Sequence, residues 1–289
     1  MDYDSTALPS ELFRHSIWEL YTPKKNACQQ KSCIFQKNIL QYIYWINELK
    51  GKRMSEVFFN GVAGRLEGRF HKSENPRAPQ ILILHPQPLQ GGTMNNRVTY
   101  AMFQAFVNMG FSVLRFNYRG VGNSQGELDG SGVGELADAI IALDWLQNLD
   151  SEANCCWIAG YSFGAWVAAQ LLMRRPEIKG FVFVSPPTDM YPFDFLTPCP
   201  ASGLIIQGGA DTIVSESSVA MLAEQLSGHK YLRVEYKVLP EADHIYSRHL
   251  KDVQDLITQI VPELKGRPRK VVKKVKKATV STVISNEDY

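Results

Sequence analysis

The sequence predicts an α/β fold in which helices cover both faces of a mostly parallel central sheet. Short apolar segments rich in Ile, Val and Phe recur through the centre of the chain, and amphipathic helical patterns lie between them. Continuous apolar runs are typical of strands that are covered on both faces. Because these runs alternate with helical patterns, we expect helices to connect successive strands and the strands to run parallel.

Six short segments are predicted to form the strands of this sheet, and two longer ones to form helices. The expected strands are 81–85, 112–117, 155–160, 181–185, 203–208 and 233–239. In 134–149 and in 245–264, apolar residues recur at the spacing of one helix face. Ahead of them, 56–71 has the pattern of a β-hairpin or of two antiparallel edge strands.

Composition narrows the class of protein. The chain has 289 residues, of which 45% are hydrophobic and 21% charged, so it can bury a large core and is not wholly disordered. The longest apolar runs, 81–84 and 181–184, are far too short to cross a bilayer as a helix. The first residues lack the pattern of a secretory signal, so we expect a cytoplasmic protein.

The five cysteines do not indicate a disulfide framework or a metal site. Their number is odd, and their spacing is not that of a zinc site. Cys155 and Cys156 are adjacent on an expected strand, so their side chains would point to opposite faces of the sheet and would not pair. We interpret the cysteines as small buried side chains in a reducing compartment, and expect neither a metal nor an organic cofactor.

Two flanking segments differ from the α/β pattern. Residues 1–53 carry no strand pattern and form an N-terminal extension, either an appendage before a second start at Met54 or a helix packed on the domain. Residues 54–264 form the expected α/β domain. The segment 265–277 holds eight Lys and Arg and no acidic residue, so the rest of the chain has a net charge of 2 − 8 = −6.

The basic tail, 265–289, has the composition of a disordered segment. Its residues 266–270 resemble the core of an AT-hook, in which arginines enter the minor groove of A·T-rich DNA. Nonspecific contact with nucleic acid or anionic lipid through 265–277 is the simpler interpretation.

The most specific chemical signal is the motif Gly160-Tyr161-Ser162-Phe163-Gly164. An expected strand precedes this G-x-S-x-G motif and a helical pattern follows it, which is the context of a nucleophile elbow. Glycine on either side of Ser162 allows the turn to close tightly, because no Cβ keeps neighbouring backbone away. We therefore expect Ser162 to be a nucleophile.

A serine hydroxyl needs a base within hydrogen-bond reach, and the base needs an orienting group. His244 follows the last expected strand, and Asp211 follows the strand before it. The carboxyl ends of parallel strands share one edge of a sheet, so these side chains and Ser162 are predicted to converge there. Asp189, after the preceding strand, and Glu241 are alternatives for the acid.

Acyl transfer also requires two N–H donors for the oxyanion. The first is expected from Phe163, and the second from the loop His85-Pro86-Gln87-Pro88. Proline has no N–H, so Gln87 is the only donor among 86–88, with Leu89 as the fallback. No carboxylate or histidine cluster accompanies His85, which favours a structural role for its ring.

Five motifs together resemble those of the α/β-hydrolase fold, and most closely a bacterial group of small serine hydrolases near the dienelactone hydrolases. They are HPQPLQGGTMNN (85–96), RFNYRGVGNSQG (115–126), GYSFGA (160–165), QGGADTIV (207–214) and EADHIY (241–246). The order Ser162, Asp211, His244 is that of the hydrolase triad. Two departures argue against transferring the dienelactone activity: Ser162 replaces a cysteine nucleophile, and His85-Pro86 replaces a His-Gly pair.

The resemblance implies a structural role for Arg119 in its turn, and Thr93 or Asn95 is expected to cap the helix that follows 91–96. Only 17 residues separate the strands that end at Ser185 and start at Gly203, which is too short and too rich in proline for a helical lid. Tyr161, Tyr191 and Phe193, together with Phe195, are candidates to line a substrate pocket; packing of Tyr191, Phe193 and Phe195 on the sheet edge is the alternative.

The sequence therefore predicts a lidless serine hydrolase that cleaves an acyl bond of a small molecule, most simply a carboxylic ester. A thioesterase or a peptidase of the same fold is an alternative. So is a non-catalytic protein of this fold that binds nucleic acid through its tail. The sequence does not assign an oligomeric state.

Overall fold

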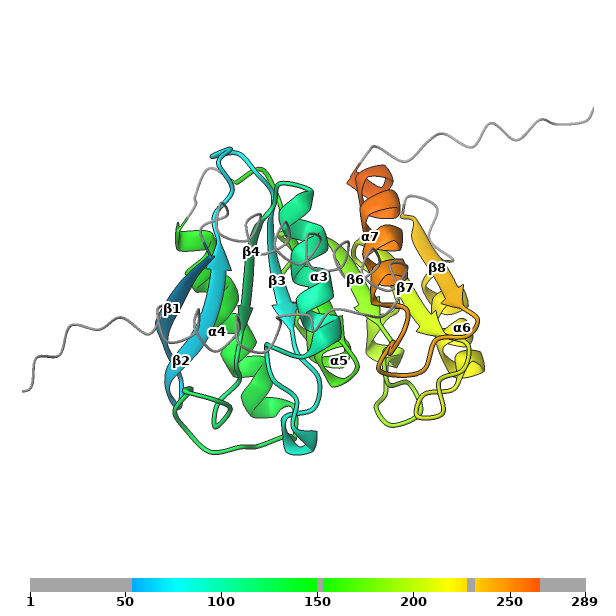
Figure 1. Cartoon of the computed structure of the whole chain (residues 1–289), viewed down its shortest axis with the longest axis horizontal. Coiled ribbons are helices and arrows are strands. Elements are labelled where there is room, and N and C mark those ends of the chain that lie inside the picture. The colour runs from blue at the N-terminus through cyan, green and yellow to red at the C-terminus, as the bar shows by residue number, and fades with distance from the viewer. Residues whose placement is uncertain (1–53, 150–152, 228–231, 266–289) are drawn as a thin grey trace, which may run out of the picture. The chain divides into compact units, whose positions relative to one another are not determined.

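The computed structural model describes residues 54–149, 153–227 and 232–265, which form one eight-stranded sheet flanked by helices (Figure 1). The order of strands across the sheet is β1-β2-β4-β3-β5-β6-β7-β8. The strands are β1 (Met54–Gly61), β2 (Gly64–His71), β3 (Gln80–Leu84), β4 (Ser112–Phe116), β5 (Cys156–Tyr161), β6 (Ile178–Val184), β7 (Ser202–Gly208) and β8 (Val234–Leu239).

The direction of the strands confirms the predicted class. β1 and β2 form an antiparallel hairpin, and β2 also pairs antiparallel with β4. All other pairings, from β4 across to β8, are parallel. Every predicted strand is present, with ends that differ from the expected ones by a few residues, and 56–71 falls within the hairpin.

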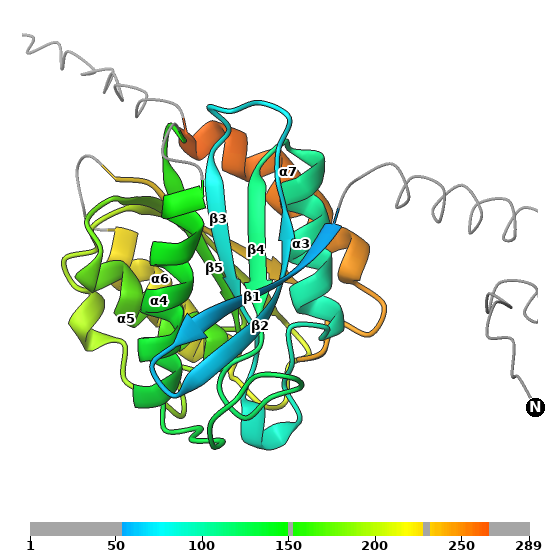
Figure 2. The same cartoon turned by 90° about the vertical axis from the view of Figure 1, so that its left-hand side faces the viewer.

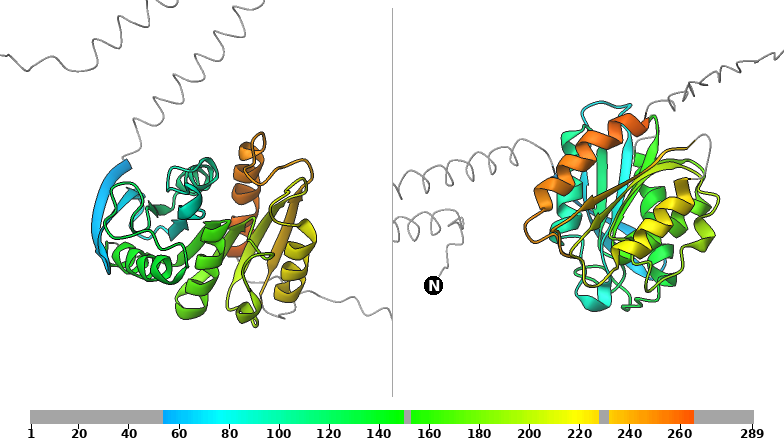
Figure 3. Two further views of the ribbon diagram at one scale, coloured as in Figure 1. Left: turned by 90° about the horizontal axis from the view of Figure 1, so that it is seen from below. Right: turned by 90° about the vertical axis from the view of Figure 1, so that its right-hand side faces the viewer.

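Helices cover both faces of the sheet, as predicted (Figures 2 and 3). One face carries α3 (Arg97–Asn108) and α7 (Leu250–Lys265). The other carries α4 (Val133–Leu149), α5 (Phe163–Arg174) and α6 (Glu216–Ser227). Two short 3-10 turns, η1 (Pro88–Gln90) and η2 (Asp194–Leu196), lie in the loops after β3 and β6.

The apolar runs of the sequence fill two core layers. Along β3, Leu82 and Leu84 face the layer of α4, α5 and α6, whereas Ile81 and Ile83 face the layer of α3 and α7. All of these side chains are fully buried. Side chains alternate between the two faces of a strand, so a strand buried on both faces needs apolar residues at every position.

Two helix starts differ from the sequence predictions. Asn96, and not Thr93 or Asn95, caps α3: its side-chain oxygen accepts hydrogen bonds from the N–H groups of Val98 and Thr99. Thr93 instead accepts one from the N–H of Asn95. The expected helix 245–264 begins only at Leu250, because the residues before it form turns that place Tyr246 at a φ of 53°.

Within the described ranges, no helix is long and apolar enough to cross a membrane. The connection between β6 and β7 contains only η2 as regular structure. The predictions for the extension 1–53 and for the tail beyond Lys265, including its contact with nucleic acid, lie outside the described residues.

Candidate active site

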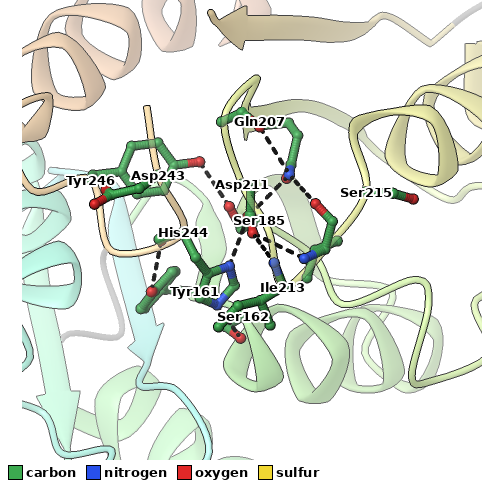
Figure 4. Close-up of polar contacts among 12 residues, drawn as sticks. Tyr161, Ser162, Ser185, Gln207, Asp211, Ile213, Ser215, Asp243, His244 and Tyr246 are labelled. Carbon is green, nitrogen blue, oxygen red and sulfur yellow. Dashed lines mark hydrogen bonds and ion pairs between the residues drawn. The ribbon is translucent and has the colours of Figure 1, made fainter. Parts of the chain in front are cut away.

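Three loops bring the predicted side chains to the carboxyl edge of the sheet. Ser162 directly follows β5, Asp211 lies after β7, and His244 lies after β8. β5 and β7 are separated only by β6, and all four strands from β5 to β8 run parallel. The sheet therefore delivers residues far apart in sequence to one place (Figure 4).

Ser162 occupies a strained turn between β5 and α5. Its φ of 52° and ψ of −124° are rarely adopted by residues other than glycine, and such strain is typical of a nucleophile elbow. The turn needs both glycines: a Cβ at Gly160 would lie 2.2 Å from the carbonyl oxygen of Gly164, and one at Gly164 would lie 2.4 Å from that of Leu84. The Ser162 N–H donates to the carbonyl oxygen of Val184 at 2.9 Å, which anchors the turn to β6.

His244 contacts both of its expected partners, and Figure 4 shows its ring between them. The distance from Nδ1 of His244 to Oδ2 of Asp211 is 2.7 Å, and that from Nε2 to Oγ of Ser162 is 3.2 Å. The side chain of Asp211 is fully buried and that of His244 is 12% exposed. With a neutral ring, Nδ1–H donates to the carboxylate and Nε2 is left to accept the serine proton.

The surroundings of Asp211 keep it ionised. Burial alone would raise its pKa, but hydrogen bonds from His244 and from the N–H groups of Val214 and Ile213 outweigh burial and lower the pKa below its usual value. The amide of Gln207 also donates to Oδ2 of Asp211, at 3.1 Å. The carboxylate is therefore an acceptor with a fixed orientation.

The alternative acids do not contact His244. Both carboxylate oxygens of Asp189 are engaged by Ser215, one through its N–H at 2.6 Å and the other through its hydroxyl at 3.1 Å. Glu241 is exposed, and no described residue bonds to its side chain. Of the three candidate acids, only Asp211 is in a position to orient the imidazole.

Two tyrosines hold the loop that carries His244. The hydroxyl of Tyr161 donates to the backbone carbonyl of His244 at 2.9 Å. Tyr246, fully buried, places its hydroxyl 2.9 Å from that of Ser185 and 3.4 Å from the carbonyl oxygen of Ile206. Sequence reasoning missed Tyr246, Ser185 and Gln207, although Tyr246 closes the quoted motif EADHIY.

One predicted oxyanion donor lies within the elbow and the other in the loop after β3. Phe163 is the first residue of α5, so its N–H has no partner within the helix. No described residue accepts a hydrogen bond from the backbone N–H of Gln87. Gln87 precedes η1, and its carbonyl oxygen accepts from the N–H groups of Gln90 and Gly92, which fixes the turn.

His85 has the structural role that the sequence favoured. Its ring is fully buried, and burial lowers its pKa to about 3, so it is neutral at pH 7. Nδ1 lies 2.8 Å from the carbonyl oxygen of Pro86, and Nε2 accepts from the N–H of Tyr118 at 3.3 Å. A neutral ring satisfies both contacts and ties the loop after β3 to the loop after β4.

The side chain of Gln87 connects three loops at this edge. Its amide nitrogen donates to the carbonyl oxygen of Gly130 at 3.2 Å and to the hydroxyl of Tyr191 at 3.1 Å. The ring of Tyr191 stacks on Trp166 with centroids 4.3 Å apart, and its centroid lies 5.7 Å from that of Phe163. Tyr191 therefore contacts both residues whose backbone N–H groups are the candidate donors.

The other candidate pocket residues lie deeper. Tyr161 is buried and holds the His244 loop as described. Phe193 is buried in the core layer of α4, α5 and α6, and it stacks on Phe195, which agrees with packing on the sheet rather than with a pocket wall. Tyr191, half-buried beside Phe163, borders the oxyanion side of the site.

One ion pair and one buried carboxylate fix the long loop after β4. Arg119 donates to both carboxylate oxygens of Asp138, at 3.0 and 2.7 Å, which confirms a structural contact for this arginine. Glu135, fully buried, accepts from the N–H groups of Gly130 and Gly132. Among the described residues, no group of three His, Cys, Asp or Glu side chains is arranged to hold a metal ion.

Comparison with known proteins agrees with this architecture. Residues 72–195 match the family model of X-Pro dipeptidyl-peptidases of the S15 family. An uncharacterized protein of Rickettsia prowazekii is 49% identical over 197 residues, which cover 67% of this chain and 82% of that protein. A mitochondrial palmitoyl-protein thioesterase of mouse is 24% identical over 207 residues, covering 70% of this chain and 62% of that protein.

Solved structures match a larger share of the chain, 72% in two cases. A protein of unknown function from Agrobacterium tumefaciens, assigned to the α/β hydrolases, is 48% identical with a TM-score of 0.70, covering 72% of this chain and 95% of that one. An α/β serine hydrolase homologue from Coxiella burnetii is 32% identical with a TM-score of 0.65, covering 72% of this chain and 97% of that one. The chain therefore belongs to the α/β-hydrolase superfamily.

Proposed function

We infer that the protein is a serine hydrolase that cleaves a carboxylic ester through an acyl-enzyme. The observation that carries this proposal is the position of the His244 ring, which bonds Asp211 through Nδ1 and reaches the hydroxyl of Ser162 through Nε2. Ser162 is the nucleophile, His244 the general base and then acid, and Asp211 the residue that orients the ring.

The reaction has two halves. Oγ of Ser162 forms a bond to the acyl carbon while Nε2 of His244 takes its proton, and the same proton then passes to the departing alcohol oxygen as the C–O bond breaks. In the second half, a water molecule gives a proton to His244 while the water oxygen attacks the acyl carbon. The Ser162–acyl bond then breaks, and the proton on His244 returns to Ser162.

The oxyanion that forms in each half is stabilised by the N–H groups of Phe163 and Gln87. One such donor is worth about 10²–10³-fold in rate in serine hydrolases. The neutral ring of His85 and the amide of Gln87 support this assignment, because they fix the loop before substrate arrives. A preorganised donor does not have to reorient during the reaction.

Thioester cleavage is the second candidate, favoured by the similarity to the mouse palmitoyl-protein thioesterase. The same residues would serve, with a thiolate as leaving group. The peptidase match supports the fold more than the activity, because it ends at residue 195 and so includes neither Asp211 nor His244.

Turnover of p-nitrophenyl acetate tests the proposal, with wild type and Ser162→Ala compared at equal concentration. We expect hydrolysis by the wild type, and a loss of at least about 10³-fold in kcat for the variant, because the remaining site lacks a nucleophile. Circular dichroism controls for folding. Unchanged turnover in a folded Ser162→Ala variant would refute the proposal.

A further inference from the structure

Four large aliphatic side chains are exposed around the candidate active site. Each lies within two residues of a group that the proposed function uses or that borders the donors: Gln87, Tyr191, Asp211 and His244. We call them the apolar rim. They are Leu89, Met190, Ile213 and Ile245, and they are 61%, 54%, 52% and 55% exposed.

The rim differs from scattered surface apolar residues in its placement. Its members come from four different loops, those that follow β3, β6, β7 and β8, and all four loops lie at the carboxyl edge of the sheet. The backbone N–H of Ile213 donates to Asp211 at 2.8 Å, so this residue lies directly beside the acid (Figure 4). Large exposed apolar side chains on all four of these loops indicate a binding surface at this edge.

One side of the site adds an aromatic wall to the rim. Tyr191 stacks on Trp166, both are half-buried, and the indole N–H of Trp166 donates to the carbonyl oxygen of Pro192 at 3.1 Å. Leu89 lies over the neighbouring loop, where a Cβ on Gly130 would come within 2.4 Å of its side chain. These contacts fix the wall in place, whereas the rim residues are more than half exposed.

The charges of the same loops have the opposite sign to the tail. The loops 85–96, 117–132, 185–201, 209–215 and 240–249 contain seven carboxylates and two arginines: Glu127, Asp129, Asp189, Asp194, Asp211, Glu241 and Asp243, with Arg119 and Arg248. Arg119 is bound to Asp138, whereas Arg248 forms no ion pair with another residue of the described ranges. The first helical residues after these loops, Arg97 and Glu216, cancel each other.

We propose that the substrate is an ester or thioester of an apolar acyl chain whose leaving group is not anionic. This proposal rests on the proposed function, which places the acyl carbon at Ser162 and hence the chain among the surrounding side chains. The rim shields the chain from water, and the acidic loops repel leaving groups that carry phosphate or sulfonate. The occupant of the rim is the chain of a single substrate molecule.

The first experiment measures kcat/KM for p-nitrophenyl acetate, butyrate, hexanoate and octanoate below their critical micelle concentrations. Full burial of a methylene improves binding about fourfold, and an open rim that covers about half of it gives about twofold. We therefore expect a ratio of octanoate to acetate of roughly 50-fold in the wild type. A flat series would overturn the proposal, as would activity on octanoate that rises only above its critical micelle concentration.

Serine variants locate the effect on the rim. Ile245→Ser is expected to lower the octanoate to acetate ratio about threefold, and replacement of all four rim residues by serine to lower it more than tenfold. Met221→Ser, on α6 and 59% exposed, is the matched control and leaves the ratio unchanged. An unchanged ratio in the fourfold variant would overturn the proposal.

Acetate turnover separates this proposal from the proposed function. If the wild type and Met221→Ser turn over the acetate and Ser162→Ala does not, the reaction at Ser162 stands whatever the chain-length series shows. If the wild type turns over no ester and Ser162→Ala changes nothing, the proposed function fails and this inference fails with it.

A salt series tests the leaving group. We compare p-nitrophenyl octanoate with the octanoyl ester of 4-hydroxybenzenesulfonate between 20 and 500 mM NaCl. Salt screens repulsion between exposed charges, so kcat/KM of the sulfonated ester is expected to rise severalfold while that of the neutral ester changes little. A fall with salt for the sulfonated ester would show attraction and overturn this part of the proposal.

Discussion

The two sides of Ser162 are held in different ways. On the acid–base side, His244 and Asp211 contact each other directly through side chains, and Tyr161 and Tyr246 hold the loop that carries His244. On the oxyanion side, the donors are backbone N–H groups, and the loop of Gln87 depends on contacts to residues from two other loops. We therefore expect a change of one atom on the acid–base side to lower kcat strongly, and single changes on the oxyanion side to lower it by smaller factors.

The largest expected effect is that of Asp211→Asn. The amide does not hold the proton on Nδ1 of His244 as the carboxylate does, so the ring adopts the tautomer with its proton on Nε2. That nitrogen then cannot take the serine proton, and we expect kcat to fall about 10⁴-fold while the fold is kept. Ester turnover with a check of thermal stability measures it. Asp189→Asn is the matched control. If its kcat fell as much as that of Asp211→Asn, Asp211 would not be the acid that distinguishes this site.

His85 provides the next largest effect, on stability. Its pKa is lowered from 6.5 to about 3 by burial, so the unfolded state binds more protons than the folded one. This group therefore stabilises the fold above pH 6.5, and that contribution is lost as the pH falls toward 3, by about 1.4 kcal/mol per pH unit.

Urea unfolding of wild type and His85→Asn between pH 7 and pH 4 measures this contribution. The variant should show a smaller dependence of the free energy of unfolding on pH, because the carboxylates contribute equally to both proteins. Identical slopes would contradict a buried neutral His85.

Tyr191→Phe sharpens the comparison on the oxyanion side. It removes the hydroxyl that accepts from the Gln87 amide and keeps the ring on Trp166. We expect kcat to fall by about fivefold, since one hydrogen bond is worth about 1 kcal/mol, with KM nearly unchanged. Tyr100→Phe, on α3, is the control. A rise in KM alone would mean that Tyr191 binds substrate and does not position the loop.

The smallest expected effect is that of Tyr161→Phe. Its hydroxyl donates to the carbonyl of His244, so its removal leaves a largely buried acceptor unpaired and loosens the loop. We expect kcat to fall about threefold and the free energy of unfolding to decrease by about 1 kcal/mol. Steady-state kinetics and urea unfolding check both. No change in either would show that Tyr246 alone fixes this loop.

The side chains of the proposed triad could be located from sequence because their positions depend on local patterns. Ser162 lies in a motif between a strand and a helix, Asp211 follows the apolar strand β7, and His244 follows β8. The parallel sheet then brings the strand ends to one edge. These features need only the period of the pattern and the order of the elements.

What supports these side chains could not be predicted, because it depends on contacts between loops. Gln207 is an interior strand residue whose amide donates to Asp211. Tyr246 has a positive φ in the turns that precede α7, so the helix begins later than expected. Asn96 rather than Thr93 or Asn95 caps α3, since the path of the loop decides which side chain faces the free N–H groups. An apolar side chain such as Phe193 suits both a pocket wall and the core, and only its packing in the structure shows that it belongs to the core.

The central claim is that Ser162 is the activated nucleophile, and covalent labelling tests it most directly. The protein is treated with a fluorophosphonate, and the adduct is mapped by mass spectrometry in wild type, His244→Ala and Ser162→Ala. We predict one adduct on the peptide that contains Ser162 in the wild type, much slower labelling in His244→Ala and none in Ser162→Ala. An adduct on another residue, or labelling of His244→Ala at the wild-type rate, would contradict the account.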